Sequence, residues 1–274
     1  MAKSKMAGAT AVVTGAGSGI GRALSIALAK RGAVVHVTDV NGETAEKVAR
    51  EIGGSAKHAR LDVRDADAVK RVVEGAGRVD YMFNNAGIGV GGEIQDLTLA
   101  HWDRILDVNV RGVIHGVHAV YPQMVARGSG HIVNTASMAG LAAAPLLTPY
   151  AMTKHAVVGL SVSLRVEAAA YGVRVSALCP SAIETPILDS DNPADLPPLK
   201  WRPDLRKFLT EISGTPYPVD KLAEETLDAV EDDVGIIVIP ARARLAWRAS
   251  RWVPALAESV VTRMVADARK TKPA

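Results

Sequence analysis

The sequence has little of several residue types, and each scarcity limits the kind of protein it encodes. A single cysteine, Cys179, among 274 residues rules out an internal disulfide and is typical of a reducing compartment. No segment approaches the roughly 18 uninterrupted apolar residues that a membrane span requires. The first residues, MAKSKMAGATAVVTGAG, are broken by glycines and lack a convincing cleavage site, so we predict no signal peptide. We therefore expect a cytoplasmic protein.

The chain has little net charge, and its excess of positive charge lies at the C-terminal end. The net charge is only +3. Residues 240–274 hold eight basic and two acidic side chains, a net charge of +6, so the remainder carries −3. The basic balance therefore comes from this tail and does not indicate a nucleic-acid-binding body. A hydrophobic content of 48% with 22% charged residues is typical of a globular protein with a sizeable core.

Short apolar runs alternate with amphipathic helical patterns along most of the chain. Such alternation indicates β-α-β units, and seven strands with helices on both faces predict a doubly wound, Rossmann-type α/β fold with a parallel sheet. The predicted strands are 10–14, 33–39, 56–62, 79–85, 131–136, 173–179 and 235–241, and the predicted helices are about 18–31, 42–52, 64–74, 99–127, 149–171 and 218–232.

Two segments break this alternation and define the expected domain organisation. Residues 1–241 form one dinucleotide-binding and catalytic domain. Within it, the Pro- and Asp-rich residues 185–217 follow a strand, where a lid over a substrate site would lie. Residues 242–274 form a basic amphipathic C-terminal extension.

A glycine-rich turn, VVTGAGSGIGRA, follows the first predicted strand and opens the first helix. Gly15, Gly19 and Gly21 allow a tight turn and a close approach of the backbone to a ligand. The free N–H groups and positive dipole end of the helix favour a diphosphate. A purely structural turn is the alternative, but the position after the first strand of an alternating chain favours cofactor binding.

Asp39, at the end of the second predicted strand, bears on the choice of cofactor. A carboxylate there accepts hydrogen bonds from both ribose hydroxyls of adenosine and repels a 2′-phosphate, which predicts NAD(H) rather than NADP(H). The alternative is a helix N-cap for the segment that starts near Asn41. Neither Arg22 nor Arg60 stands beside Asp39 in the sequence to accommodate a phosphate.

Tyr150 and Lys154 lie four positions apart in PYAMTKHA. On a helix they share one face, and a nearby ammonium would lower the pKa of a phenol that normally titrates near pH ~10. A Tyr-x-x-x-Lys pair alone is a weak signal, because such a spacing also arises by chance.

Six motifs in order, with family-like spacing, make a stronger signal. The chain resembles the classical short-chain dehydrogenase/reductases (SDR) over about residues 8–241, in the motifs TGAGSGIG, LDV, NNAG, Asn109, Ser137 and YAMTK. Ser137 precedes Tyr150 by 13 residues, as the family has it.

The resemblance implies four catalytic residues. Tyr150 is then the acid/base, and Lys154 lowers the pKa of the phenol and binds the nicotinamide ribose. Ser137 polarises the substrate oxygen, and Asn109 anchors a water that links Lys154 to solvent. Taken singly, Ser137 would be a strand-end cap and Asn109 a helix-bending polar residue.

The resemblance also implies contacts to NAD, the expected cofactor. Asp62 and Val63 would meet the adenine, the NNAG motif would line the adenosine ribose while Asn84 braces the sheet, and the backbone of Ile183 would bind the carboxamide. The full set of expected cofactor-binding residues is Gly15, Ser18, Gly19, Ile20, Gly21, Asp39, Asp62, Val63, Asn85, Ala86, Gly87, Tyr150, Lys154, Pro180, Ile183 and Thr185.

The chain departs from the family pattern at two places. Ser181 stands where the family has glycine after Pro180, which puts the local loop geometry in question, and the stretch from Asp62 to Asn84 is about a turn shorter than usual. His115 and His118 have the i,i+3 spacing of two metal ligands, but no third ligand accompanies them, so we predict no metal site. The absence of G-x-S-x-G argues against a serine hydrolase.

The tail, ARLAWRASRWVPALAESVVTRMVADARK, interleaves arginines with large apolar residues. A basic amphipathic helix can lie on an anionic membrane, but we favour packing on the body or on a second subunit. Pro254 would interrupt one continuous helix. We expect the tail to contribute to oligomer contacts or to an apolar rim of the substrate site. The family resemblance suggests a homodimer or homotetramer built through the predicted helices 99–127 and 149–171.

Together these features predict an NAD(H)-dependent oxidoreductase that interconverts a secondary alcohol and a ketone. The largely apolar LAAAPLLTPY, residues 141–150, favours a moderately hydrophobic small-molecule substrate. The alternatives are an NADPH-dependent carbonyl reductase and a non-catalytic dinucleotide-binding sensor, although a pure binder has no need of Ser137.

Overall fold

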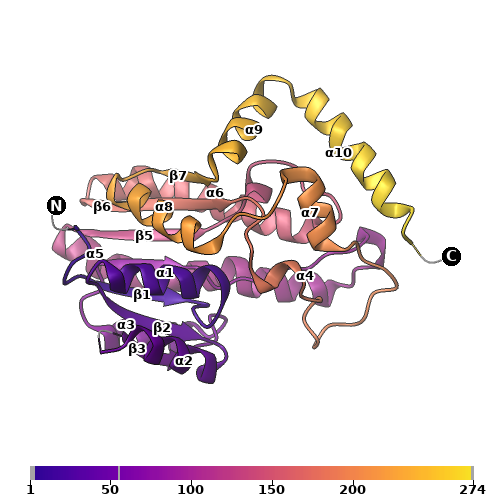
Figure 1. The fold of residues 1–274 in the computed structure, drawn as a ribbon. Helices are drawn as coiled ribbons and strands as arrows, with labels where there is room; N and C mark the ends of the chain where they lie inside the picture. The colour runs from indigo at the N-terminus through magenta and orange to yellow at the C-terminus, as the bar shows by residue number, and fades with distance from the viewer. Residues whose placement is uncertain (1–3, 55, 273–274) are drawn as a thin grey trace.

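The computed structural model describes residues 4–54 and 56–272, and a seven-stranded sheet forms its centre (Figure 1). All strand pairs are parallel, in the order β3-β2-β1-β4-β5-β6-β7, which confirms the predicted doubly wound fold. The strands are β1 Thr10–Thr14, β2 Val34–Asp39, β3 Ala56–Arg60, β4 Tyr81–Asn84, β5 Gly130–Thr135, β6 Val173–Pro180 and β7 Ile236–Ile239. The predicted strands 56–62, 79–85 and 235–241 are therefore each shorter than expected.

Helices cover both faces of the sheet because both faces are apolar. On one face, Leu24, Val48 and Leu227 pack in one core; on the other, Val120 and Leu164 pack in a second. The first face carries α1 Gly19–Lys30, α2 Gly42–Ile52 and α8 Val219–Glu231, and the second carries α3 Ala66–Ala76, α5 Gly112–Arg127 and α6 Thr148–Ala169.

Local sequence fixes several helix ends. The side chain of Asn41 accepts hydrogen bonds from the N–H groups of Glu43 and Thr44 at the start of α2, and Asp65 caps α3 by accepting from Ala68. Helix α5 ends at Gly128, whose φ of 70° is the left-handed conformation common after a helix. These caps set the direction in which the chain leaves each strand end.

The predicted helix over 99–127 is helical along its whole length, but it is not one regular α-helix. The segment is α4, Leu99–Leu106, followed by a π-helical turn over Asp107–Arg111 and then α5. A wider turn of this kind changes the hydrogen-bonding of the helix backbone and is frequent at functional sites. It contains Asn109, so the irregularity coincides with an expected site residue.

The segment 185–217 follows β6 and contacts α4 and the loop after β4. Asn192 exchanges two 3.0 Å hydrogen bonds with the backbone of Gly91, and His101 in α4 contacts the carbonyl of Pro197 at 3.1 Å. The segment contains the short helical turn Pro186–Leu188 and helix α7, Leu205–Ser213. Its contacts therefore reach the loop after β4 and helix α4.

The C-terminal extension forms two helices, α9 Ala241–Trp252 and α10 Pro254–Arg269, with the expected break at Pro254. Figure 1 shows α9 leading away from the sheet and α10 returning toward the side on which α4 and α7 lie. Among the described residues, we find no helix with the length and apolar character needed to cross a membrane.

Candidate active site

One cavity of about 620 Å³ runs along the carboxyl ends of the strands, where the strand order reverses between β1 and β4. In open α/β sheets, ligands bind at this reversal point. The lining begins with Asp39 and Asp62 at one end, passes the glycine-rich turn, and reaches Tyr150 and then Phe208. The cavity therefore joins the predicted cofactor residues to the predicted catalytic residues.

The glycine-rich turn packs too tightly for side chains. A Cβ atom on Gly15, whose φ is 63°, would lie 2.7 Å from the Cα of Ala86, and one on Gly21 would lie 2.2 Å from the carbonyl oxygen of Gly15. The N-cap Ser18 makes no side-chain cap hydrogen bond, and the first turn of α1 holds no acid. The N–H groups in the first turn of α1 are thus free to bind an anion, such as the diphosphate of a dinucleotide.

Asp39 is held at the edge of the cavity by backbone donors. Its carboxylate accepts hydrogen bonds from the N–H groups of Gly17, at 2.9 Å, and Asn41, at 3.0 Å. Since Asn41 caps α2, Asp39 is not the N-cap that was considered as its alternative role. Gly17 was not among the predicted site residues, although a Cβ there would meet Asp39 at 2.9 Å.

The tertiary structure also brings Arg60 next to Asp39. The two are register partners in neighbouring strands β2 and β3, and the Arg60 guanidinium donates to the carbonyl of Val40 at 3.3 Å. The sequence alone did not reveal this proximity, because 21 positions separate the two residues. Arg22 instead pairs with Glu51 on the surface.

The NNAG motif braces the sheet more than the sequence indicated. Asn84 donates to Asn134 at 2.8 Å and is buried, as expected. The amide of Asn85 donates to the carbonyls of Thr14 and Gly15, at 3.0 and 3.2 Å, and accepts from Thr135. Asn85 therefore fixes the glycine-rich turn, and it lines the cavity together with Ala86 and Gly87.

Asp62 and Val63 line the far end of the cavity. The carboxylate of Asp62 binds the guanidinium of Arg64, with Nε contacts of 2.9 and 3.0 Å, and these hydrogen bonds lower its pKa. The carbonyl of Val63 accepts from the ring of His115 at 2.8 Å. His115 thus has a structural partner, and no group of three metal-ligating side chains occurs in the part of the chain that the structure describes.

Asn109, in the π-helical turn, is buried and fully hydrogen-bonded. Its amide accepts from the N–H of Ile88 at 2.9 Å and donates to the carbonyl of Ile88 at 3.0 Å and the hydroxyl of Thr153 at 3.2 Å. A Cβ on Gly87 would lie 3.4 Å from its oxygen and 3.5 Å from Nζ of Lys154. Asn109 and the Lys154 ammonium therefore both lie beside Gly87, and the Asn109 side chain fixes the loop after β4.

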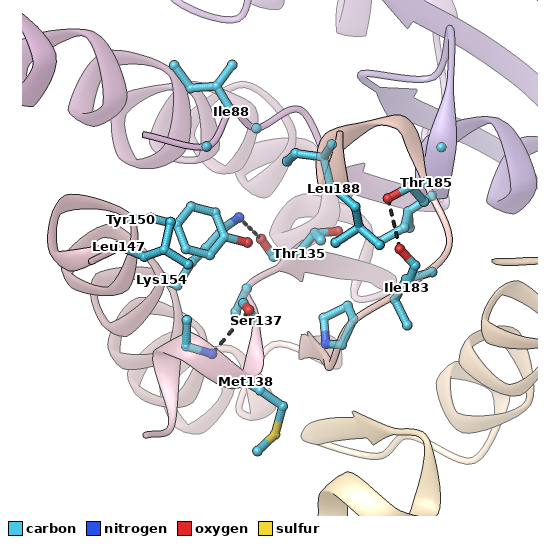
Figure 2. Close-up of a pocket in the computed structure, with 18 of the residues that line it drawn as sticks. Ile88, Thr135, Ser137, Met138, Leu147, Tyr150, Lys154, Ile183, Thr185 and Leu188 are labelled. Carbon is cyan, nitrogen blue, oxygen red and sulfur yellow. Dashed lines mark hydrogen bonds between the residues drawn. The ribbon is translucent and has the colours of Figure 1, made fainter. Parts of the chain in front are cut away.

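Tyr150 and Lys154 lie one turn apart on α6 and face Thr135 and Ser137 at the end of β5 (Figure 2). Nζ of Lys154 donates to the carbonyl of Thr135 at 2.8 Å and lies 5.5 Å from the centroid of the Tyr150 ring. Ser137 accepts from the N–H of Ala139 at 3.1 Å, which fixes its hydroxyl at the start of a helical turn. The structure thus brings all three side chains together on one wall of the cavity.

Burial dominates the electrostatics of this group. It raises the pKa of Tyr150, and hydrogen bonding from Ser137 partly opposes the rise. It also lowers the pKa of Lys154 to about 8. The direction for the phenol is opposite to the lowering of its pKa that the sequence predicted, because desolvation of the phenolate is the largest cause of the shift. Protonated Tyr150 and protonated Lys154 are therefore the dominant forms at neutral pH.

The segment after β6 closes the next part of the wall. Pro180, Ile183 and Thr185 all line the cavity, and the hydroxyl of Thr185 donates to the carbonyl of Ile183 at 3.1 Å. Ser181, at the position where the family has glycine, donates its N–H to Ile239 at 2.9 Å. Of the residues described, only Leu146 and Asp233 are non-glycine residues with positive φ. The loop therefore accommodates a serine without strain.

Beyond Tyr150 the lining of the cavity is largely apolar, and most of its residues were not singled out in the sequence. Leu147 belongs to the apolar stretch 141–150 that the sequence indicated, whereas Met138 and three residues of α7, Phe208, Leu209 and Ile212, were not singled out. The amphipathic pattern of residues 204–213 was the available signal, since its apolar face had to lie against something. Arg242, Ala243 and Ala246, at the start of the tail, also line the cavity.

Comparisons with known proteins identify the family of this chain. The sequence profile of the short chain dehydrogenase family matches residues 9–195. The chain belongs to this family and is an oxidoreductase. It is 38% identical over 194 residues to a cyclohexanol dehydrogenase from Acinetobacter sp. (strain SE19), a match that covers 68% of this chain and 77% of the relative.

Two solved structures resemble the fold closely. A short chain dehydrogenase/reductase from Burkholderia phymatum in complex with NAD has a TM-score of 0.83 and 30% identity, over 93% of this chain and 96% of that one. A 3-ketoacyl-(acyl-carrier-protein) reductase from Brucella melitensis complexed with NADH has a TM-score of 0.76 and 31% identity, over 87% of this chain and 100% of that one. Relatives of this fold therefore bind NAD or NADH.

Proposed function

We propose that this protein is an NAD(H)-dependent oxidoreductase that interconverts a secondary alcohol and a ketone. The observation that carries the proposal is the convergence of Ser137, Tyr150 and Lys154 on the wall of a cavity that continues from the glycine-rich turn. A binding protein would need the turn but not this polar group beside an apolar pocket. The arrangement holds an alcohol or carbonyl oxygen next to a proton donor and acceptor.

In this proposal each residue of the chain has one task. A bound nicotinamide would accept or supply the hydride. Ser137 orients the substrate oxygen by hydrogen bonding, and Tyr150 gives its proton to that oxygen in reduction or removes it in oxidation. Lys154, adjacent to Tyr150 and hydrogen-bonded to Thr135, supplies the positive charge that favours the phenolate. Asn109 fixes the loop that borders the Lys154 ammonium.

The preference for NAD(H) rests on Asp39. Its carboxylate, held by two backbone N–H groups at the cavity edge, suits a ribose diol and repels a phosphate. Arg60 is the observation that favours the alternative, an NADPH-dependent carbonyl reductase, because its guanidinium lies on the neighbouring strand. We assign the preference to Asp39, since Asp39 lines the cavity and Arg60 does not.

The substrate end supports a moderately hydrophobic alcohol. Leu147, Phe208, Leu209 and Ile212 form its walls, and the only polar groups the mechanism needs there are Ser137 and Tyr150. A pocket of this kind orients a substrate mainly by apolar contact. The similarity to a cyclohexanol dehydrogenase is consistent with a cyclic secondary alcohol, such as cyclohexanol.

The test is turnover measured by the absorbance of the reduced nicotinamide, with NAD or NADP and a panel of cyclic and linear secondary alcohols. Tyr150→Phe removes the proton-transferring oxygen and keeps the ring, so it should abolish turnover while NADH binding, followed by fluorescence, is retained. NADH binding without turnover of any alcohol or ketone by the unaltered protein would instead favour the alternative of a dinucleotide-binding sensor.

A further inference from the structure

The last turn of α10 is fastened to a buried carboxylate far away in the sequence. Glu93, whose side chain is 6% exposed, accepts hydrogen bonds from the Arg269 guanidinium at 2.8 and 3.0 Å and pairs with the Lys272 ammonium at 2.9 Å. The same ammonium lies 5.1 Å from the ring centroid of Trp201. The Arg269 and Lys272 side chains are 53% and 33% exposed, but the carboxylate that binds both is nearly buried, which distinguishes the attachment from a pair of two exposed side chains.

Apolar contacts continue this attachment along α10. Val265, 9% exposed, packs in one cluster with Leu146 and Phe208. Met264 and Ala268 lie against the same cluster, together with Trp201 and Leu209. By contrast, the first turns of α10 are exposed. Among the side chains of α10 that the structure describes, those in contact with the body therefore lie in its second half, next to the attachment at Glu93.

The residues that α10 holds are walls of the substrate cavity or their direct supports. Phe208 and Leu209 line the cavity on one side and contact α10 on the other. Leu146 precedes the cavity residue Leu147 and lies four positions before Tyr150. Leu146 has a φ of 62°, a conformation that a branched side chain adopts only when its surroundings impose it.

The loop that carries Glu93 holds Leu146 from the other side. The N–H of Gly92 donates to the carbonyl of Leu146 at 2.8 Å. A Cβ atom on Gly91 would lie 3.0 Å from the side chain of Leu147, so the loop and the start of α6 are in close contact. Leu146 is thus held between the Glu93 loop and Val265 of α10.

We propose that α10 is a strap, fastened at Glu93 by Arg269 and Lys272, that fixes the apolar wall of the substrate cavity and the entry to the catalytic helix. Glu93, Arg269 and Lys272 are positioning residues in this proposal, since none of them lines the cavity. The strap sets how closely Phe208 and Leu147 approach the substrate, and it leaves the dinucleotide end of the cavity unaffected.

The experiment is amide hydrogen exchange on the full chain, with Arg269→Gln/Lys272→Gln compared with the unaltered protein. Loss of both cations should speed exchange in residues 205–213 and 144–149 by about tenfold or more. In the unaltered protein, local opening of these segments has to break the attachment at Glu93, and in the double variant it does not. Exchange in α2, which has no contact with the strap, should not change. Equal exchange in both proteins at residues 205–213 and 144–149 would overturn the proposal.

Two matched variants separate the attachment from a general charge effect. Lys270→Gln removes a neighbouring charge whose partner, Asp267, lies 2.6 Å away in the same helix, and it should leave exchange unchanged. Arg269→Lys keeps the charge and should retain most of the protection. Acceleration by Lys270→Gln as large as that caused by the double variant would count against a specific attachment at Glu93.

The kinetic consequence rests on the function proposed above. The double variant should raise the KM of cyclohexanol several-fold, by about fivefold or more, while the dissociation constant of NADH stays constant. The exchange measurement tests the strap proposal whether or not the protein turns over an alcohol. Alcohol turnover by the unaltered protein tests the proposed function separately. An unchanged KM for cyclohexanol in an active double variant would overturn the strap's role in substrate binding.

Discussion

Nζ of Lys154 lies 5.5 Å from the centroid of the Tyr150 ring and donates a 2.8 Å hydrogen bond to the carbonyl of Thr135. The ammonium is 97% buried at residue level and has no carboxylate beside it among its hydrogen-bond partners in the described residues. Burial lowers its pKa to about 8 for this reason. The Lys154 ammonium lies where the proposed chemistry requires a positive charge, and its burial lowers the stability of the fold.

Lys154→Met should therefore abolish alcohol turnover and yet stabilise the fold at pH 7. Because the pKa falls from 10.5 to about 8 on folding, the buried charge is least favourable below pH 8. The penalty decreases as pH rises from about 8 to 10.5 and is absent above. We expect a gain of about 1–2 kcal/mol at pH 7, after the loss of the hydrogen bond to Thr135, and no gain near pH 10.5.

Urea unfolding at pH 7 and at pH 10.5 would measure this gain for Lys154→Met. Lys47→Met on the exposed face of α2 is the control and should change stability little at either pH. A gain of the same size at both pH values would show that its source is apolar packing and not the buried charge.

Asp39 should determine the preference between the two cofactors. Asp39→Asn removes the negative charge, keeps a side chain that can accept from the N–H of Gly17, and leaves Arg60 on the neighbouring strand. We expect NADPH affinity to rise about tenfold or more and NADH affinity to fall, which corresponds to about 1–3 kcal/mol each. Fluorescence titration with both cofactors measures this.

Adding Arg60→Gln to Asp39→Asn tests the part played by the guanidinium. If Arg60 meets the 2′-phosphate, the gain in NADPH affinity should fall back toward the original value. Unchanged NADPH affinity in Asp39→Asn itself would contradict the role of the carboxylate.

Two helical glycines should respond to alanine in opposite ways. A Cβ atom on Gly116 of α5 would lie 1.8 Å from Oδ1 of Asn84, a buried side chain hydrogen-bonded to Asn134, so the overlap is not relieved by rotation. We expect Gly116→Ala to destabilise the fold by about 2–4 kcal/mol. Gly75 of α3 has nothing within 4 Å of such an atom, so Gly75→Ala should stabilise by about 0.5–1 kcal/mol.

Thermal unfolding monitored by circular dichroism distinguishes these two outcomes. Equal effects of the two substitutions would show that the contact between Gly116 and Asn84 is not as close as the structure has it.

The exposed side of α6 should form an oligomer contact, as the family resemblance suggests. Val162 and Val166 are one turn apart on α6 and are 42% and 75% exposed, so they form an apolar pair on the surface of this chain. We expect Val166→Lys to weaken the oligomer, because the substitution would bury an unpaired charge in the subunit contact. Light scattering should then give a lower molar mass for the variant than for the unaltered protein. A monomeric mass for the unaltered protein would remove the basis for this prediction.

Much of the fold could be predicted because its signals are local. Such signals depend only on neighbouring residues: glycines after the first strand, apolar β-branched runs and helical periodicity. They were enough to predict the parallel sheet and the break at Pro254. The π-helical turn at Asn109 was missed because it arises where α4 meets the loop after β4: the Asn109 amide bonds to Ile88, 21 positions earlier. Periodicity within one segment carries no information about such a partner.

Except for Gly21 and Asn109, the residues expected at the site line one cavity, because the spacing of short motifs already specified strand ends and a helix face. The sequence by itself thus determined the doubly wound architecture, the glycine-rich turn, and the pairing of Tyr150 with Lys154 on one face of a helix. Only the tertiary structure decided the sign of the pKa shift of Tyr150, the proximity of Arg60 to Asp39, and the attachment of Arg269 to Glu93. Each of these depends on burial or on contacts between residues far apart in the chain, and neither is encoded in local sequence patterns.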